Sequence, residues 1–459
     1  MSTLLGLDLG TSTFKVSAYR HTGEYLETVS AVTPWWAAAS GSELRPADFA
    51  NAVRTIVEEC ASRAGDQVAA IGVTGMAEAM FVETTDGVVH PAGAWNEKDR
   101  RIRPLPAPEL FARTGLLDVA RTPAVELRRI TDAGGQVRSW SGLPEFAVQL
   151  LGGTAVAERS LGARSGLVDV RAGDWSAELL RWAGVEDVTV PPLLPAGTSA
   201  GVVESGPCVG AVLTVAGHDH IVAAVGSGAA DDMTVFDSLG TGEALIARIV
   251  SERAALDPGA LSEFAAAGFN VSLGVDVDDV IAFAGLGTGN RFNLLLKALA
   301  DNGYARDKVL QPGTRPGGAP ESVGALLSDE AADLVEALGG PHWQLLRGTA
   351  SAIVARNVTD LESARVMWWA VVARATRNAR DALDSLGRLV PQATRRVAAG
   401  GWLGSAGIRE VRENMLGPFE LPRVEQSGTR GAALFAGLAA GIYRSRTDFP
   451  SFTGTGATA

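Results

Sequence analysis

The chain has 459 residues, of which 46% are hydrophobic and 20% are charged, as is typical of a globular protein with a full core. Its formal net charge of −12 argues against nucleic-acid binding through a basic face. The sequence reaches Asp8 without a basic or apolar leader, and the apolar stretch near 432–443 is too short to span a bilayer. We therefore expect a cytoplasmic protein that binds neither nucleic acid nor membrane.

The N-terminal 75 residues alternate between strand and helix patterns. Apolar runs predict strands over 4–9, 14–19, 25–33 and 68–74. Pro46 opens a helix whose apolar residues recur at helical spacing. Strand hairpins followed by a helix and a further strand indicate a mixed α/β sheet.

The remainder of the chain divides into a region of insertions and a second α/β region. Segment 100–210 is rich in proline and arginine and predicts helices and loops. Strands are expected at 211–216, 233–239, 243–250 and 397–401, and helices at 363–386 and 429–442. The last fifteen residues are rich in Thr, Ser and Gly and predict a flexible tail.

An internal repeat bears on the architecture. A strand–turn–strand pattern with a Gly-Thr turn occurs at 8–12 and again at 238–242. Two similar units in one chain suggest two related α/β domains, although Gly-Thr pairs also recur by coincidence. We place the N-terminal domain at 1–232, the C-terminal domain at 233–445 and the flexible tail at 446–459.

The two turns suggest a phosphate site. A Gly-Thr turn between strands presents backbone N–H groups and a hydroxyl, which suit phosphate oxygens, although a plain hairpin would look the same. The residues expected to bind phosphate or nucleotide are Gly10, Thr11, Ser12, Lys15, Gly240, Thr241, Gly242, Gly400 and Gly401. Asp8 precedes the first turn and could hold Mg²⁺ through water. Lys15 either neutralises phosphate charge or caps its strand.

Asp219 is the candidate catalytic base. It follows a predicted strand and is flanked by Gly217 and a small-residue segment. His218 and His220 beside it raise the alternative of a metal site, but adjacent strand residues point to opposite faces. Neither a P-loop nor a Rossmann dinucleotide motif is present.

These motifs, taken in order, resemble the FGGY carbohydrate kinases of the actin-like ATPase superfamily. Segment 6–15 is similar to the first phosphate motif of that family and 237–242 to the second. Gly217-His-Asp219 matches its G-x-D motif, and Gly400-Gly401 followed by 428–433 is similar to its C-terminal nucleotide signature. The resemblance runs from about residue 3 to 443 and implies an α/β fold of two ribonuclease H-like domains facing a central cleft.

The resemblance implies ATP-dependent phosphorylation of a small sugar or polyol, with Mg²⁺ and with Asp219 as general base. The residues expected to contact the substrate are Met76, Ala77, Glu78, Trp95, Glu97 and Asp219. Trp95 could belong to the core instead, and Glu78 could be a solvent-exposed loop carboxylate. A homodimer is one expectation, because dimers are common among similar kinases.

Departures from the family pattern concern the substrate. Met76 stands where glutamine is usual, Glu97 replaces an aspartate, and the following arginine is displaced to Arg100. A ketopentose such as xylulose or ribulose is the favoured substrate, while gluconate-like acids and glycerol-like polyols stay open. Two alternatives without sugar kinase activity also stay open, an actin-like ATP-binding regulator and a phosphohydrolase.

Overall fold

The chain folds into two compact units in a computed structural model, which describes residues 2–38, 41–93, 105–120, 122–249, 256–310, 327–340, 342–424 and 426–450. The first unit comprises Met1–Asp232, Ile246–Phe283 and Pro422–Ala459, and the second comprises Met233–Leu245 and Ala284–Leu421. The predicted domains 1–232 and 233–445 share the boundary after Asp232. Two later segments, however, belong to the first unit by their contacts.

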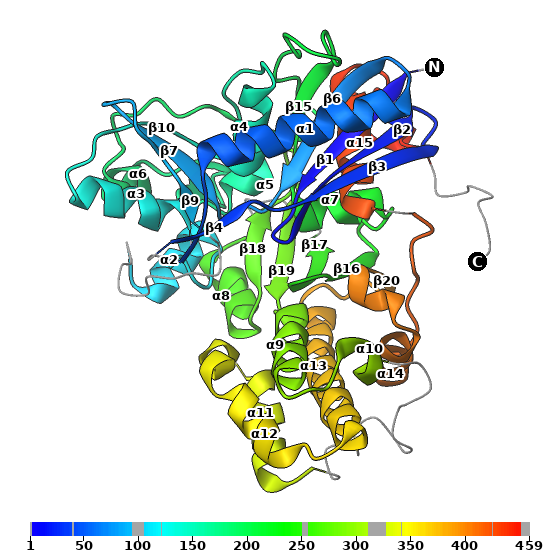
Figure 1. Cartoon of the computed structure of the whole chain (residues 1–459). Coiled ribbons are helices and arrows are strands. Elements are labelled where there is room, and N and C mark those ends of the chain that lie inside the picture. The colour runs from blue at the N-terminus through cyan, green and yellow to red at the C-terminus, as the bar shows by residue number, and fades with distance from the viewer. Residues whose placement is uncertain are drawn as a thin grey trace. The chain divides into compact units, whose positions relative to one another are not determined.

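A five-stranded sheet in the order β15-β6-β1-β2-β3 forms the centre of the first unit (Figure 1). Its strands are β1 (Thr3–Leu9), β2 (Thr13–Arg20), β3 (Tyr25–Val32), β6 (Val68–Gly75) and β15 (Val212–His218). β1 pairs in antiparallel with β2 and in parallel with β6, which in turn pairs in parallel with β15. The carboxyl ends of β1, β6 and β15 therefore lie at one edge of the sheet.

Helix α1 (Pro46–Ala64) packs on one face of this sheet. Proline at the first helical turn suits its fixed φ, and the helix ends at Gly65 in the left-handed conformation, with φ 71°. Its buried stripe, including Phe49, Val53 and Ile56, joins the apolar core with the strands. Burial of each such side chain stabilises the fold by about 1.5–3 kcal/mol.

Helix α15 (Ser427–Ala439) covers the opposite face together with α7 (Asp219–Gly226). Glycines allow this close approach, because a Cβ at Gly6 would lie 1.8 Å from the carbonyl oxygen of Thr429, and one at Gly72 would lie 2.0 Å from that of Ala432. These backbone contacts explain why the C-terminal helix belongs to the first unit rather than to the predicted C-terminal domain.

The first unit also carries an inserted region that contains strands as well as the predicted helices and loops. Its elements between residues 35 and 194 are β4 (Trp35–Ala38), β5 (Gly41–Leu44), β7 (Met80–Thr84), β8 (Val89–His90), β9 (Ala92–Gly93), α2 (Ala107–Thr114), α3 (Pro123–Asp132), β10 (Val137–Gly142), α4 (Leu143–Leu150), β11 (Ala157–Glu158), α5 (Arg159–Gly162), β12 (Val168–Asp169), β13 (Asp174–Trp175), α6 (Ala177–Ala183) and β14 (Leu193–Leu194). The later elements of the same unit are α8 (Pro258–Ala266), β18 (Asn270–Leu273), β19 (Val280–Gly285, with its last two residues beyond the boundary) and η5 (Arg446–Asp448).

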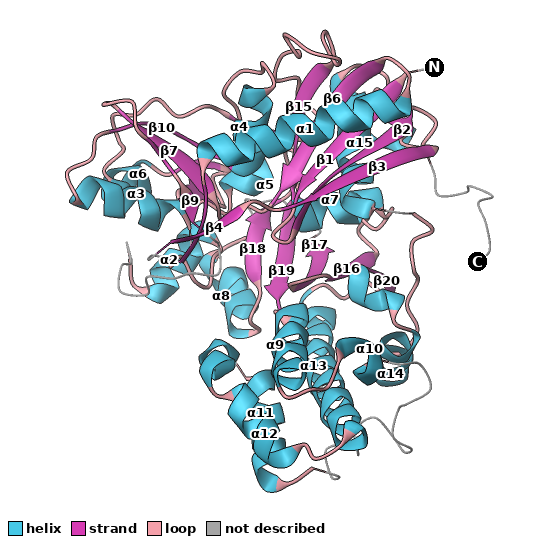
Figure 2. Cartoon of the chain, in the orientation of Figure 1, coloured by secondary structure: helices cyan, strands magenta, loops and turns pink. Residues whose placement is uncertain are grey.

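The second unit is mainly helical (Figure 2). Its elements are β16 (Thr234–Leu239), β17 (Glu243–Arg248, which crosses the boundary), α9 (Thr288–Asp301), α10 (Arg306–Val309), α11 (Asp329–Gly339), η3 (Trp343–Gly348), α12 (Ala350–Asn357), α13 (Leu361–Leu389), β20 (Arg395–Ala399), η4 (Gly401–Gly404) and α14 (Ala406–Leu416). β16 and β20 pair in parallel. Asp360 and Ser363 form a capping box at the start of α13, whose apolar stripe enters the core of this unit.

The start of the predicted flexible tail is anchored. Arg446 forms ion pairs with Asp276 and Asp279, and the ring of Phe449 lies 5.8 Å from that of Phe435 and 5.3 Å from that of Tyr443. Charge pairing and aromatic packing thus hold the segment up to Pro450, while 451–459 lie outside the described residues. Among the described helices, none combines the length and the apolar character needed to traverse a bilayer.

Candidate functional site

The first Gly-Thr turn connects β1 and β2 and has a fixed shape. The Oγ1 atom of Thr33 donates to the carbonyl of Gly10 at 2.8 Å, and the indole Nε1 of Trp35 donates to the carbonyl of Thr11 at 2.7 Å. The backbone N–H of Thr33 donates to the carbonyl of Ser12 at 3.2 Å. The carbonyl oxygens of the turn therefore accept hydrogen bonds from residues 33 and 35 of the same unit.

Asp8 lies at the end of β1, just before this turn. Its Oδ1 atom is buried without a hydrogen-bond partner, and Oδ2 lies so close to α15 that a Cβ at Gly428 would be 2.5 Å away. Burial, and then the charge of Asp219, raise the pKa of Asp8 to about 7, while Lys15 opposes the rise. A buried carboxylate with an unused oxygen is a group that a cation would stabilise.

Lys15 is the cross-strand partner of Asp8 in the β1–β2 pair. Its Nζ atom donates to Oε1 of Gln426 at 2.9 Å. Gln426 has φ 58°, a left-handed conformation that is uncommon outside glycine. Lys15 thus lies beside the carboxylate that precedes the turn, and its contact with phosphate stays a prediction.

Asp219 begins α7 directly after β15. Its side chain is 24% exposed, so the carboxylate is accessible. Oδ1 accepts from the backbone N–H of His220 at 2.7 Å and lies 3.3 Å from Nε2 of His218. Burial lowers the pKa of His218 to about 3, so this ring is neutral beside Asp219.

The sheet brings Asp8 and Asp219 to the same edge. Asp8 of β1 pairs with Thr74 of β6, and His218 of β15 pairs with Gly75 of β6. The two carboxylates therefore lie at the carboxyl ends of strands on either side of β6, and they interact electrostatically. This edge is where ligands commonly bind in open α/β sheets.

A buried chain of hydrogen bonds supports the end of β15. The Oγ1 of Thr74 donates to the carbonyl of Gly217 at 2.6 Å. The backbone N–H of His218 donates to Oγ of Ser160 at 2.9 Å, and that hydroxyl donates to Oε2 of Glu158 at 2.6 Å. Gly217 has φ 114°, and a Cβ there would lie 2.7 Å from Oγ of Ser160. Glycine is thus required two residues before the candidate base.

Glu78 is not a solvent-exposed loop carboxylate, which was the alternative to its role as a substrate contact. Its Oε1 accepts two hydrogen bonds from Arg164, at 2.9 Å from Nε and 2.6 Å from Nη2. The two side chains are only 15% and 14% exposed. The guanidinium also lies 5.2 Å from the centre of the Phe283 ring, which is itself 5.5 Å from the ring of His218.

The other residues predicted to contact the substrate are either buried in the core or outside the described residues. Met76 and Ala77 are 4% and 5% exposed and belong to the apolar core of the first unit, so packing explains both. Trp95 and Glu97, with the nearby Arg100, lie outside the described residues. Their contact with a substrate stays a prediction.

The second Gly-Thr turn lies in the second unit, between β16 and β17. The N–H of Gly240 donates to the carbonyl of Gly242 at 3.0 Å, and Thr241 lies between them. Gly400 approaches the same place, because a Cβ there would lie 2.2 Å from the carbonyl oxygen of Leu239. Gly401 follows with open space beside its α-carbon. Two separate predicted nucleotide motifs are therefore neighbours in this unit.

Asp8 fits the role of a Mg²⁺ ligand by its unused buried oxygen and its raised pKa. Within the described ranges, no group of three or more His, Cys, Asp or Glu side chains is arranged to hold a metal ion. The structure therefore gives no support to a metal site built on the two histidines beside Asp219. A Mg²⁺ ion here would use Asp8 with phosphate and water oxygens, since Mg²⁺ sites commonly combine one or two carboxylates with phosphate and water.

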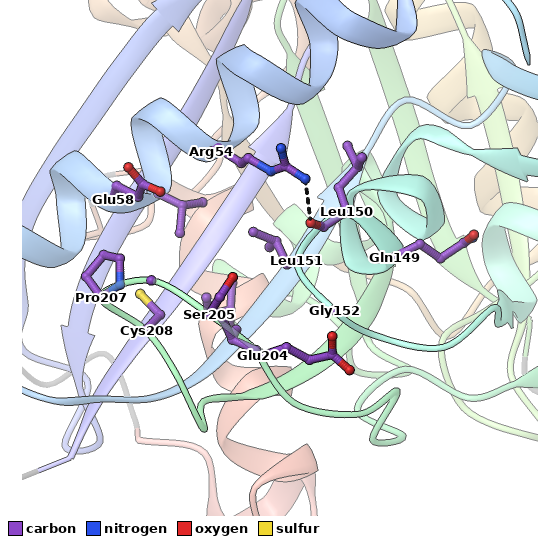
Figure 3. A pocket seen from close by; sticks show the side chains of 14 residues that line it. Arg54, Glu58, Gln149, Leu150, Leu151, Gly152, Glu204, Ser205, Pro207 and Cys208 are labelled. Atoms are coloured by element: carbon purple, nitrogen blue, oxygen red, sulfur yellow. Dashed lines mark hydrogen bonds between the residues drawn. The ribbon is translucent and has the colours of Figure 1, made fainter.

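A separate hollow of about 460 Å³ lies in the first unit between α1 and two loops (Figure 3). Arg54 and Glu58 of α1 line it with Leu150 and Glu204, and Nη2 of Arg54 donates to the carbonyl of Leu150 at 3.4 Å. None of the predicted site residues lines this hollow.

Arg164, Ser160 and Phe283 are candidate functional residues that sequence reasoning missed. Arg164 and Ser160 lie in segment 100–210, for which the sequence predicted only helices and loops. Arginine supplies almost all of the basic charge in this chain, so one more arginine does not stand out. Phe283 is an apolar residue in an apolar strand. No local pattern distinguishes these residues, because their roles depend on contacts with distant segments.

Comparison with known proteins gives a consistent result. Residues 3–226 match the N-terminal domain of the FGGY family of carbohydrate kinases. A glycerol kinase from Leptothrix cholodnii is 26% identical, with 97% of this chain and 92% of that protein covered. A glycerol kinase from Acidovorax sp. is also 26% identical over the same shares.

Solved structures show the same fold. A xylulose kinase from Lactobacillus acidophilus matches with a TM-score of 0.77 at 19% identity, covering 98% of this chain and 92% of that one. A glycerol kinase from Plasmodium falciparum, solved with ADP, matches with a TM-score of 0.72 at 14% identity, covering 97% and 91%. The predicted α/β fold of the actin-like ATPase type is thereby confirmed.

Proposed function

We propose that this chain, which matches the N-terminal domain of the FGGY family of carbohydrate kinases over residues 3–226 and resembles glycerol kinases along its length, transfers the γ-phosphate of ATP to a hydroxyl group of a small polyol. The observation that carries this proposal is the shared strand edge of Asp8 and Asp219. One carboxylate is accessible for proton transfer, and the other is buried with an oxygen to spare.

In the proposed reaction, Asp219 accepts the proton of the substrate hydroxyl. The hydroxyl oxygen then forms a bond to the γ-phosphorus, the bond from that phosphorus to the bridging oxygen breaks, and ADP leaves with the electron pair. Such transfers depend mainly on positioning and on charge stabilisation. The neutral His218 lies beside the base, with its Nε2 3.3 Å from Oδ1 of Asp219. In the first unit the turn at Gly10–Ser12 binds phosphate oxygens in this proposal, and in the second unit the turn at Gly240–Gly242 has the same role.

Asp8 would hold Mg²⁺. The ion supplies positive charge that offsets the negative charge of the phosphates. Lys15, across the β1–β2 pair from Asp8, adds a second positive charge at the same turn.

The substrate we propose is glycerol or a polyol of similar size rather than a ketopentose. Two observations support the smaller substrate. Glycerol kinases match this chain along almost its whole length. Glu78, which resembles a position that glycerol kinases fill with glutamate, is held by Arg164 with one oxygen engaged, so its other oxygen can accept from a substrate hydroxyl.

The test is ADP release from Mg·ATP with glycerol, xylulose, ribulose and gluconate, each supplied separately. We expect release that depends on glycerol, with kcat/KM for glycerol well above that for the ketopentoses. Release that depends only on xylulose or ribulose would overturn the substrate proposal but keep the kinase. Release independent of every acceptor would indicate a phosphohydrolase, and ATP binding without release would indicate a regulator.

A further inference from the structure

Three buried charged side chains meet at the base of the second Gly-Thr turn. Nη2 of Arg412, from α14, lies 2.5 Å from Oδ2 of Asp237 and 2.5 Å from Oε1 of Glu243. The side chains of Arg412, Asp237 and Glu243 are 1%, 11% and 0% exposed. None of the three was singled out as a site residue by its sequence context.

The position of these residues along the chain is informative. Asp237 belongs to β16, three residues before Gly240, and Glu243 begins β17 directly after Gly242. One guanidinium group therefore joins the two strands at the points where the turn begins and ends. A contact that spans the root of a turn fixes the separation of its two arms.

Helix α9 fixes the same turn from a second side. The hydroxyl of Thr288, the first residue of α9, donates to the other carboxylate oxygen of Glu243. A Cβ at Gly289 would lie 2.0 Å from the carbonyl oxygen of Gly240, so the helix and the turn are in direct backbone contact. Both oxygens of Glu243 are thereby engaged, one by Arg412 and one by Thr288.

The charges in this cluster make Arg412 indispensable to its geometry. Burial opposes the charge of Arg412, but the two carboxylates outweigh burial and hold its pKa above the usual range. Without the guanidinium, two buried carboxylates would face each other and repel. Buried ionic clusters add little net stability, and their best-attested use is to specify one arrangement among several.

We propose that Arg412 is a positioning residue for the second phosphate turn, and that its contacts with Asp237 and Glu243 preorganise Gly240–Gly242 to bind the phosphates of ATP. This inference rests on the proposed function, because it assumes that the turn binds phosphate. It adds a residue in a helix far along the chain, whose side chain is buried.

The test compares the affinities of ATP and adenosine for the full chain and its variants. Arg412→Met removes the cation, and Arg412→Lys keeps the charge as a compact ammonium group whose position differs from that of Nη2. We expect each to weaken ATP binding by about tenfold or more while adenosine affinity changes less than about threefold, since small misplacement of a binding group is costly. Arg356→Lys is the matched control, because Arg356 pairs with Glu330 on the surface of the same unit.

The outcomes separate this inference from the proposed function. A wild-type chain that fails to bind ATP would overturn the proposed function itself. A wild-type chain that binds ATP, with variants that keep their preference for ATP over adenosine, would overturn the role of Arg412 alone. Equal loss of both ligands would also overturn it, because a merely structural role lowers both affinities. If Arg412→Met does not fold, Arg412→Lys decides the question.

Discussion

The two Gly-Thr turns share a sequence pattern but differ in how their neighbouring carboxylates are balanced. Beside the second turn, Asp237 and Glu243 are held by Arg412 in a buried cluster. Beside the first turn, Asp8 faces the carboxylate of Asp219, which together with burial raises its pKa. Asp8 and Asp237 each keep one buried oxygen without a hydrogen-bond partner, so the difference that the comparison teaches is the guanidinium that joins the carboxylates at the second turn.

Replacement of the candidate base should have the largest effect on turnover. We expect Asp219→Asn to lower kcat by about 10²–10⁴-fold, the contribution typical of general-base assistance, while ATP affinity stays nearly unchanged. Measurement of ADP release and of ATP binding checks both parts. Asp66→Asn is the control, since Asp66 forms an exposed ion pair with Arg20 in the same unit. Turnover above a tenth of wild type would show that Asp219 is not the base.

Replacement of Asp8 tests whether its carboxylate binds Mg²⁺. We expect Asp8→Asn to raise the Mg²⁺ concentration needed for half-maximal activity by about 10- to 100-fold, as the loss of a group that holds a metal through water does. The melting temperature should stay the same or rise, because a buried carboxylate without a partner is costly. An unchanged Mg²⁺ requirement would count against the role of Asp8.

Replacement of Arg164 tests the buried ion pair that this residue forms with Glu78 in the first unit. We expect Arg164→Lys to raise KM for the polyol by about tenfold, equivalent to about 1.4 kcal/mol of binding, with KM for ATP unchanged. Steady-state kinetics with each substrate varied in turn measures this difference. Arg138→Lys is the control, because Arg138 pairs with Glu83 at the surface. A matching rise in KM for ATP would indicate general damage instead.

Glu158 should show that a buried carboxylate can also be purely structural. Burial raises its pKa from 4.5 to about 8, so the folded chain holds a proton that the unfolded chain releases between these values. The free energy of unfolding should therefore fall as pH rises through this window, by about 1.4 kcal/mol per pH unit.

The variant Glu158→Gln removes this titration. We expect a weaker dependence of stability on pH, measured by urea unfolding at pH 6 and pH 7.5. Glu204→Gln, at an exposed position, should keep the slope of the wild type. Equal slopes in Glu158→Gln and wild type would show that Glu158 is already ionised in the folded chain.

The sequence by itself determined the elements and the order of the motifs. Predicted strands at 4–9, 14–19 and 68–74 correspond to β1, β2 and β6, and the helix predicted at 363–386 lies within α13. These elements could be predicted because the periodicity of apolar residues reports directly on helix and strand geometry. The candidate base could be found because it follows a strand and a glycine within a short motif.

Only the tertiary structure decided which charges meet. Arg164 reaches Glu78 across 86 residues, and Arg412 reaches Asp237 across 175. It also decided that α15 packs on β1 and β6, where Gly6 and Gly72 admit its backbone. The physical reason is that local patterns record which face of an element is apolar, whereas the pairing of two buried charges depends on how distant elements pack together.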